Sequence, residues 1–507
     1  MSTEPVLELS NICKRFGKLV ANDAISLSLG QGELLALLGE NGAGKTTLMN
    51  ILFGHYTADE GEVRAFGALL PPGRPRAAIE AGIGMVHQHF TLAGNLSVLD
   101  NIVIGTEPLS RIRSDRAAAH RKLAALSERF GLQVDPEALV GDLSVGEKQR
   151  VEILKALYRD ARVLILDEPT AVLTTQEAEQ LFETLQGMTR TGLSVIFISH
   201  KLAEVMSASE RVVILRGGKV VAERRTAETD RAELAELMVG RRVSRPVRQD
   251  QEPGEEVLAA RQVDVIEDGR KTLDAISFSV NSGEVLGIIG VSGNGQASLG
   301  RLTCGLVGAS AGTLVHAGRQ SRTFSARALV RSGTARIPED RNAEGAIGEM
   351  TVWENAVLER VHDDRFSTRG LVDRGACRAF ADDVISRFDV RGASADTGTR
   401  LLSGGNMQKL ILGRNLAGAP NLIIANQPTR GLDEGAIAAV HSELLDARLA
   451  GAAILLISED LDEVLALSDR VQAIFNGRLS QPIAARDADS KSVGLMMAGI
   501  WGQSDAA

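Results

Sequence analysis

The chain has 507 residues, of which 44% are hydrophobic and 24% charged, and its formal net charge is −9. The length predicts two domains of roughly 250 residues each, the composition is typical of a soluble globular protein, and the acidic balance argues against nucleic-acid binding. Cys13, Cys304 and Cys377 form no CxxC pair, which argues against a zinc site or a disulfide framework and favours a reducing cytoplasm. No apolar run approaches the ~18 residues of a membrane-spanning helix, and the N-terminus lacks the pattern of a signal peptide.

The first segment that carries chemistry spans residues 33–52, where an apolar strand is followed by a glycine-rich loop and a helix. Residues 39–46, GENGAGKT, match the phosphate-loop pattern G-x-x-x-x-G-K-[ST] at every position. Such a loop turns backbone N–H groups toward phosphate oxygens, its lysine reaches the β- and γ-phosphates, and its hydroxyl residue ligates Mg²⁺. A glycine turn without chemistry is disfavoured, because strand and helix stand where the motif needs them. The predicted ATP-binding residues of this segment are Gly39, Glu40, Asn41, Gly42, Ala43, Gly44, Lys45, Thr46 and Thr47.

Three further motifs follow along the first half of the chain. LSVGE (143–147) places Ser144 at the start of a helix, where a serine is either a simple N-cap or part of an anion site. RVLILDEPT (162–170) ends a buried strand in Asp167 and Glu168. Asp167 is placed to help hold Mg²⁺ and Glu168 to polarise the attacking water, although such a pair alone is usually a solvated turn. The apolar strand of residues 193–199 leads into His200.

The second half of the chain repeats the first. Residues 6–33 align without gaps on residues 257–284, and LSVGE, DEPT, ISH and LMVG recur in the same order as LSGGN, NQPT, ISE and MMAG. Five matched blocks in fixed order indicate a tandem duplication. Residues 241–256 are charged, contain two prolines and lack periodicity, which is typical of a linker. We therefore predict an α/β protein with domains at 1–240 and 257–500, a linker at 241–256 and a tail at 501–507.

The order of phosphate loop, Gln88 in MVHQHF, LSxGE, LILDEPT and ISH resembles the ATP-binding-cassette (ABC) ATPases over essentially the whole chain, twice. The resemblance implies a mostly parallel core sheet and a helical subdomain in each domain. It implies that Phe16 stacks on adenine, although a lone phenylalanine is otherwise more often a core residue. It also implies that Gln88 senses the metal and links to a membrane partner, and that His200 contacts the γ-phosphate. The predicted catalytic residues are Lys45, Gln88, Glu168 and His200, and the predicted Mg²⁺ ligands are Thr46, Gln88 and Asp167.

In this family two cassettes pair head to tail, which implies two composite sites in this chain. The first combines the intact loop of domain 1 with Ser403, Gly404 and Gly405 of LSGGN, beside the aspartate Asp433. The second combines residues 290–297, GVSGNGQA, with Ser144 and Gly146, beside Thr174. The second site is predicted to be non-hydrolytic, since the groups that chemistry needs are replaced. Its degenerate positions are Gln296, Ala297, Asn426, Gln427 and Glu459, with Glu267 in the place of Phe16 and Glu339 near the place of Gln88.

The sequences PEDR (338–341) and PTRGLD (428–433) resemble the ribose/galactose type of sugar importer, and MVHQHF leans toward its nucleoside-importing branch. This implies an ATPase at the cytoplasmic face of the plasma membrane that works with two transmembrane permease subunits. A periplasmic or lipoprotein solute-binding protein is expected to act through those permeases. Neither nucleic acid nor direct insertion into the membrane is expected. The alternative is a soluble tandem cassette protein acting on ribosomes or DNA, and a non-catalytic scaffold is a weaker third reading.

Overall fold

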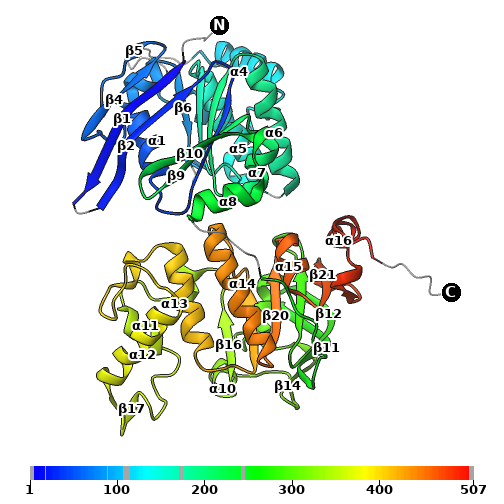
Figure 1. Cartoon of the computed structure of the whole chain (residues 1–507). Coiled ribbons are helices and arrows are strands. Elements are labelled where there is room, and N and C mark those ends of the chain that lie inside the picture. Colours follow the sequence, from blue (N-terminus) through cyan, green and yellow to red (C-terminus); the bar gives the residue numbers. More distant parts are fainter. Residues whose placement is uncertain are drawn as a thin grey trace, which may run out of the picture. The chain divides into compact units, whose positions relative to one another are not determined.

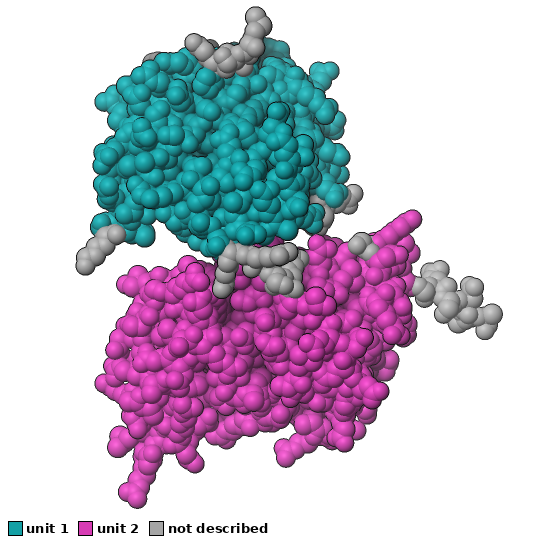
Figure 2. Space-filling view, in the orientation of Figure 1, with its two compact units in different colours: residues 1–243 teal, residues 244–507 magenta. Residues whose placement is uncertain are grey.

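The computed structural model describes residues 5–17, 19–87, 90–106, 115–170, 173, 175–240 and 246–501. The chain divides into two compact units, residues 1–243 and residues 244–507 (Figure 2). Within the described ranges, no helix is long and apolar enough to cross a membrane.

Unit 1 is built around a six-stranded sheet in the order β10-β9-β3-β8-β7-β6, in which only β9 and β10 pair antiparallel (Figure 1). The parallel strands are continuous apolar runs because helices cover both faces of the sheet, so alternation with polar residues is not needed. The strands are β3 (Leu34–Leu38), β6 (Ile83–Val86), β7 (Val163–Asp167), β8 (Ser194–Ser199), β9 (Arg211–Arg216) and β10 (Lys219–Arg225).

A second sheet of unit 1 is antiparallel, in the order β2-β1-β4-β5. Helix α1 lies between the two sheets, because Leu48 and Leu52 pack into one apolar cluster with Leu35 and Leu37 of β3 and with residues of β1. The strands are β1 (Leu7–Phe16), β2 (Leu19–Leu29), β4 (Glu60–Ala65) and β5 (Ala68–Leu69). The start of α1 lies beside β2, where the Asn22 amide donates to the Gly44 carbonyl at 3.1 Å.

Four helices of unit 1 begin at a side chain that accepts a hydrogen bond from the first helical turn. Ser97, Asp115, Ser144 and Asp230 each cap a helix in this way, which satisfies N–H groups that lack a partner inside the helix. The helices are α1 (Lys45–Phe53), α2 (Pro75–Glu80), α3 (Val98–Val103), α4 (Arg116–Phe130), α5 (Val145–Tyr158), α6 (Thr175–Arg190), α7 (Leu202–Ala208) and α8 (Arg231–Val239). Helices α3, α4 and α5 form a helical subdomain whose core includes Leu99, Leu123 and Ile153.

Unit 2 repeats this architecture, which confirms the predicted α/β fold of two cassettes. Its central sheet has the order β16-β19-β20-β13-β21-β22. The first five strands correspond, in this order, to β6, β7, β8, β3 and β9 of unit 1, so the two sheets have the same strand order. Its antiparallel sheet has the order β12-β11-β14-β15. The strands are β11 (Glu256–Glu267), β12 (Arg270–Asn281), β13 (Val285–Ile289), β14 (Ala311–His316), β15 (Arg319–Ser321), β16 (Thr334–Ile337), β19 (Leu422–Asn426), β20 (Ala453–Ser458), β21 (Arg470–Phe475), β22 (Arg478–Leu479) and β23 (Ile483–Ala484).

The helical subdomain of unit 2 contains α11, α12 and α13 and carries a short hairpin of β17 (Ser367–Thr368) and β18 (Leu371–Val372). The helices are α9 (Gln296–Thr303), α10 (Ala326–Arg331), α11 (Val352–Val357), α12 (Arg374–Arg387), α13 (Gly404–Leu416), α14 (Glu434–Leu449), α15 (Leu461–Leu467) and α16 (Ser490–Met497). Residues 246–255, within the expected linker, form no helix or strand. They are nevertheless fixed to unit 2, since Arg248 pairs with Asp469 at 2.6 Å and Arg448 donates to the Gln249 carbonyl.

Candidate active site

The glycine loop of unit 1 lies between β3 and α1, with Lys45 as the first residue of the helix. The Lys45 ammonium group is buried and donates to the carbonyl oxygens of Gly39 (2.7 Å) and Glu40 (2.9 Å). Gly44 has a φ of 99°, and a side chain there would collide with the carbonyl of Ala21. The loop therefore requires glycine at this position and holds a cation at the N-terminus of α1, which favours an anionic ligand.

The remaining loop residues have the conformation that the motif predicts. Gly42 also has a positive φ (82°), and the Ala43 N–H closes a turn onto the Glu40 carbonyl at 3.1 Å. Asn41 lies in the same turn, while Thr46 and Thr47 lie in the first turn of α1. These residues surround the start of the helix, but their role as ATP ligands stays a prediction.

Asp167 ends β7 and points its carboxylate at the first turn of α1, where the Thr46 hydroxyl donates a hydrogen bond to it. Burial, reinforced by the neighbouring Glu168, raises the pKa of Asp167 to about 6. A buried carboxylate of this kind is costly unless a cation balances its charge. The pair of Thr46 hydroxyl and Asp167 carboxylate thus fits Mg²⁺, which prefers oxygen ligands.

Glu168 follows Asp167 and forms a pair with His200, whose Nδ1 lies 3.1 Å from Glu168 Oε1. Glu168 has a φ of 47°, a conformation that costs energy in a residue with a side chain and that recurs at functional sites. Burial pushes the pKa of Glu168 upward, but the hydrogen bond and charge of His200, helped by Lys45 and Lys201, outweigh it and leave that pKa below its ordinary value. Glu168 is therefore ionised at neutral pH, which a group that orients and polarises water requires.

Phe16 lies at the end of β1 with 43% of its surface exposed, so it is not a core residue. Its ring meets the edge of Tyr56 at a centroid distance of 5.6 Å, and the Lys14 ammonium lies 5.5 Å from it. Tyr56 was missed by sequence reasoning; the available signal was an aromatic residue shortly after α1. An exposed aromatic face of this kind can accept a planar base.

Gln88 and Thr174 lie outside the described residues, and so does His89. His87, directly before Gln88, stacks on His55 with ring centroids 5.5 Å apart and an angle of 10° between planes. Burial, together with the nearby His55, lowers the pKa of His87. Sequence analysis did not identify this histidine pair, because the two residues are 32 positions apart in the chain.

In the glycine loop of unit 2, the side chain of Gln296 takes the place of a lysine. Its Nε2 donates to the Val291 carbonyl at 2.7 Å, and its Oε1 accepts from the Asn294 N–H at 3.0 Å. The amide is buried and bonds the loop carbonyl that corresponds to the one bound by Lys45, but it carries no positive charge. Ala297 offers a methyl group in the position of the Thr46 hydroxyl.

The strand ends of unit 2 also lack the chemistry of unit 1. Gln427 has a φ of 50° and the same backbone hydrogen bond as Glu168, but it carries an amide. Asn426 replaces Asp167, and its buried Oδ1 finds no partner among the described residues. Glu459 replaces His200, and its backbone N–H donates to Gln427 at 3.4 Å. Glu267, in the place of Phe16, pairs with Arg301 at 2.9 Å. Unit 2 thus keeps the backbone conformation of a phosphate-binding unit, but it lacks the two strand-end carboxylates and the loop lysine of unit 1.

The two signature serines differ in what their hydroxyl groups do. Ser144 caps α5, and its hydroxyl donates to the Glu147 carboxylate at 2.7 Å. Ser403 caps α13, and its oxygen accepts from the backbone and side-chain N–H groups of Asn406. The Ser403 proton is therefore not used by Asn406, and Gly404 and Gly405 follow it at the start of the helix. The start of α13 can donate to an anion, whereas the start of α5 carries a carboxylate.

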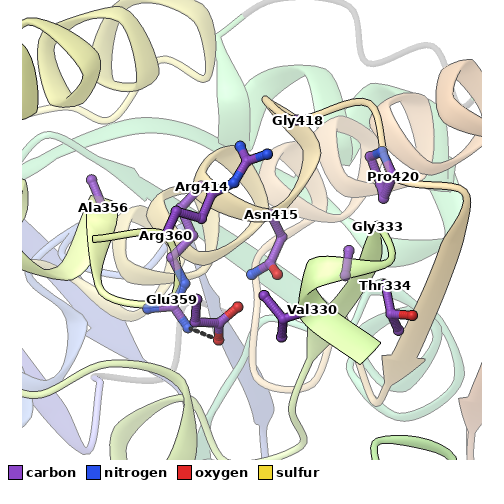
Figure 3. A pocket seen from close by; sticks show the side chains of 11 residues that line it. Val330, Gly333, Thr334, Ala356, Glu359, Arg360, Arg414, Asn415, Gly418 and Pro420 are labelled. Carbon is purple, nitrogen blue, oxygen red and sulfur yellow. Dashed lines mark hydrogen bonds and ion pairs between the residues drawn. The ribbon is translucent and has the colours of Figure 1, made fainter. Parts of the chain in front are cut away.

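A hollow in unit 2, shown in Figure 3, has a volume of about 40 Å³ and lies where α10, β16, α11 and α13 meet. Arg414 is buried in its wall and reaches Glu359 at 3.4 Å, and burial lowers the pKa of Arg414. The space holds about one water molecule and is too small for a nucleotide. This hollow is therefore no candidate for a nucleotide site.

Comparison with known proteins shows the family of the chain. Residues 22–171 and 273–430 match the family model described as ABC transporter. The guanosine import ATP-binding protein NupO of Bacillus subtilis is 44% identical over 98% of this chain and 98% of its own length. The nucleoside import ATP-binding protein NupA of Lactococcus lactis is 41% identical (98% and 99% covered), and the glucose import ATP-binding protein TsgD13 of Haloferax volcanii is 44% identical (98% and 96% covered).

A solved structure of the archaeal ribosome recycling factor aABCE1 with the stalk protein aP1 covers 96% of this chain and 92% of its own, with a TM-score of 0.64. At 17% identity, that likeness shows the fold alone. The family model and the full-length relatives carry the assignment further. The chain belongs to the ABC transporter family, as a tandem-cassette ATPase of the sugar and nucleoside importer type.

Proposed function

We propose that this chain hydrolyses ATP in unit 1 to power the import of a nucleoside, with a simple sugar as the second candidate solute. The observation that carries this proposal is the set of charged and polar groups around one glycine loop, in contrast to their replacement in unit 2. Lys45, Thr46, Asp167, Glu168 and His200 converge at the start of α1.

Each of these side chains has a task that follows from its surroundings. Lys45 and the N–H groups at the start of α1 bind the β- and γ-phosphates, because both are positive and fixed in place. Thr46 and Asp167, with Gln88, hold Mg²⁺, which neutralises phosphate charge when bound. The ionised Glu168 orients the attacking water, and His200 holds the Glu168 carboxylate in position at 3.1 Å. Phe16 provides the face on which adenine stacks.

We further propose that Ser403, Gly404 and Gly405 complete this site, following the head-to-tail pairing of the family. The donor character of the Ser403 turn supports this role, since Asn406 does not use the hydroxyl proton. The other site, with Gln296, Ala297, Asn426, Gln427 and Glu459, is non-hydrolytic. This second site has a structural role and does not hydrolyse ATP.

The partners follow from the importer type. Two transmembrane permease subunits carry the solute, a periplasmic or lipoprotein solute-binding protein delivers it, and this chain binds peripherally at the cytoplasmic face of the membrane. The nucleoside proposal is supported by MVHQHF and by the guanosine and nucleoside import relatives. The glucose import relative and the ribose import ATP-binding protein of Yersinia pestis, 36% identical, support a sugar.

The test is transport by the reconstituted complex. The chain is co-expressed with candidate permeases from the same genome, purified, and placed in liposomes with ATP inside and the solute-binding protein outside. Uptake of labelled guanosine, uridine and ribose is then measured with the wild type and with Lys45→Ala. We expect ATP-dependent nucleoside uptake that Lys45→Ala abolishes. Ribose uptake alone would assign a sugar, and co-sedimentation with ribosomes without any uptake would refute the importer proposal.

A further inference from the structure

Arg341 joins three loops of unit 2 that are far apart in the sequence. It is the last residue of the PEDR sequence and the first of a short π-helical turn, η3 (Arg341–Gly345), which Asp340 caps. Its Nη1 donates to the carbonyl oxygen of Arg430 at 2.7 Å. Arg430 opens the D-loop, the RGLD sequence of residues 430–433, whose Asp433 caps α14. One guanidinium group thus ties the PEDR turn to the D-loop.

The same guanidinium group lies against Gly404, the third residue of the LSGGN signature. A Cβ atom added at Gly404 would come within 2.7 Å of Arg341 Nη2 and 3.1 Å of Cζ. Real Cβ atoms do not approach other atoms so closely, so an alanine at 404 would displace the Arg341 guanidinium group from this position. The planar group is therefore packed flat on the signature turn, one residue from the Ser403 hydroxyl.

Unit 1 lacks this arrangement at the matching positions. The repeat alignment places Phe90 opposite Arg341 and Val145 opposite Gly404. A valine at 404 would exclude the guanidinium group, so arginine and glycine occur together in one unit and are both absent from the other. The signature that contains this arginine–glycine contact is the one assigned to the competent ATP site. A role confined to the stability of unit 2 would not explain why the contact occurs at that signature.

The charge around Arg341 is arranged to leave its guanidinium group available to the signature turn. Glu339, two residues earlier, forms an ion pair with Arg430 instead. Asp340 uses its carboxylate to cap η3, accepting from Asn342 and Ala343. Arg341 Nε is buried and has no hydrogen-bond partner within the described part of the chain. The Arg341 guanidinium group is thus held by the Arg430 carbonyl and by packing against Gly404 more than by a carboxylate.

We propose that Arg341 is a positioning residue for ATP hydrolysis: by stacking on Gly404 and binding the Arg430 carbonyl, it holds the signature turn and the D-loop in one fixed relation. This inference rests on the proposed function, in which the Ser403 turn completes the ATP site. An ATPase site tolerates little error in geometry, and a misplacement of about 1 Å can cost 10²-fold in rate. Loss of Arg341 leaves the loop of unit 1 intact and loosens only the turn that has to meet the γ-phosphate.

The experiment compares Arg341→Ala, Arg341→Lys and Gly404→Ala in the complex with permeases, with exposed Arg327→Ala as the matched arginine control and Val145→Ala as the matched signature control. The turnover number, the KM and the ATP affinity of the resting protein are measured. We expect Arg341→Ala to lower turnover at saturating ATP by about tenfold or more, with resting ATP affinity within about twofold. Arg341→Lys keeps the charge but not the planar group, so it is not expected to restore the rate. Both controls are expected to stay within about twofold of the wild type.

The double variant Arg341→Ala/Gly404→Ala separates positioning from a general effect on the fold. If the alanine at 404 acts by displacing the guanidinium group, it adds no more than about a twofold loss once Arg341 is gone. Losses that simply multiply, full rescue by lysine, or a wild-type rate in Arg341→Ala would each overturn the inference. Ser403→Arg shows which proposal fails: if it leaves hydrolysis unchanged, the composite site is wrong, and if it blocks hydrolysis while Arg341→Ala does not, only the role of Arg341 is wrong.

Discussion

Replacing Asp167 with asparagine should stabilise the nucleotide-free protein while abolishing hydrolysis. Asp167 is 6% exposed and lies beside Glu168. Burial and the charge of Glu168 together raise the pKa of Asp167 from the ordinary value of 3.8 to about 6. A carboxyl with a higher pKa in the folded chain favours folding only while it is protonated. Its contribution is therefore fully present below pH 3.8, is lost as the pH rises through about 6, and is a net cost at pH 8.

The shift sets the size of the effect. At about 1.4 kcal/mol per pKa unit, a rise from 3.8 to about 6 corresponds to about 3 kcal/mol. Asparagine keeps an oxygen that can accept from Thr46 but has to bury a new N–H₂ group, so we expect a net gain of about 1–3 kcal/mol at pH 8. For a unit of this size, that raises the melting temperature by roughly 2–10 °C. The gain should shrink steadily between pH 8 and pH 5.

The assay is calorimetry of the full chain without nucleotide, in which the transition that ATP and Mg²⁺ shift in the wild type is assigned to unit 1. Asn426→Asp in unit 2 is the matched reverse change, and it should lower the other transition at pH 8. An equal gain for Asp167→Asn at pH 5 and pH 8 would mean that packing, and not charge, is responsible. A loss of stability at pH 8 would refute the reasoning outright.

Other predictions concern the chemistry of the two units. Lys45→Ala should abolish ATP turnover, whereas Gln296→Ala should leave it within about twofold, because a neutral amide stabilises little transition-state charge; a large loss from the second change would contradict a single competent site. Glu168→Gln should retain ATP through gel filtration and hydrolyse it roughly 10²-fold more slowly or worse, and rapid turnover would remove Glu168 from the catalytic role. Ser403→Arg should block hydrolysis while Ser144→Arg harms it much less when both are assayed with the membrane partners. Greater damage from Ser144→Arg would reverse the pairing.

The parts of the site that sequence could predict are those built from contiguous residues. The glycine loop, its lysine and the first turn of α1 form one local structure, so the pattern of residues 39–46 already determines the geometry seen at Lys45 and Gly44. Asp167 could be placed because a buried parallel strand has to end at the same edge of the sheet. The alignment of the two repeats then identified the corresponding positions in unit 2.

The parts that sequence did not predict depend on contacts between distant segments. Tyr56 meets Phe16, and His55 meets His87, only because α1 is packed between the two sheets of unit 1. The raised pKa of Asp167 depends on burial, which no motif states. Arg341 was noticed only as part of PEDR, and its contact with Gly404 requires the folded turn to be known.

The asymmetry within the chain supports the proposed pairing without any reference to how the units are arranged. Unit 1 keeps the catalytic loop but has a signature whose Ser144 hydroxyl is engaged by Glu147. Unit 2 has lost the loop chemistry at Gln296, but no carboxylate accepts from its Ser403 hydroxyl within the described residues, and Arg341 lies against the signature turn. If each unit completed its own site, each site would combine one intact motif with one altered motif, the motifs being the glycine loop and the signature. Neither site would then be competent. Exchange of halves places both intact parts in one site and both altered parts in the other, so selection on one competent site preserves this pattern of residues.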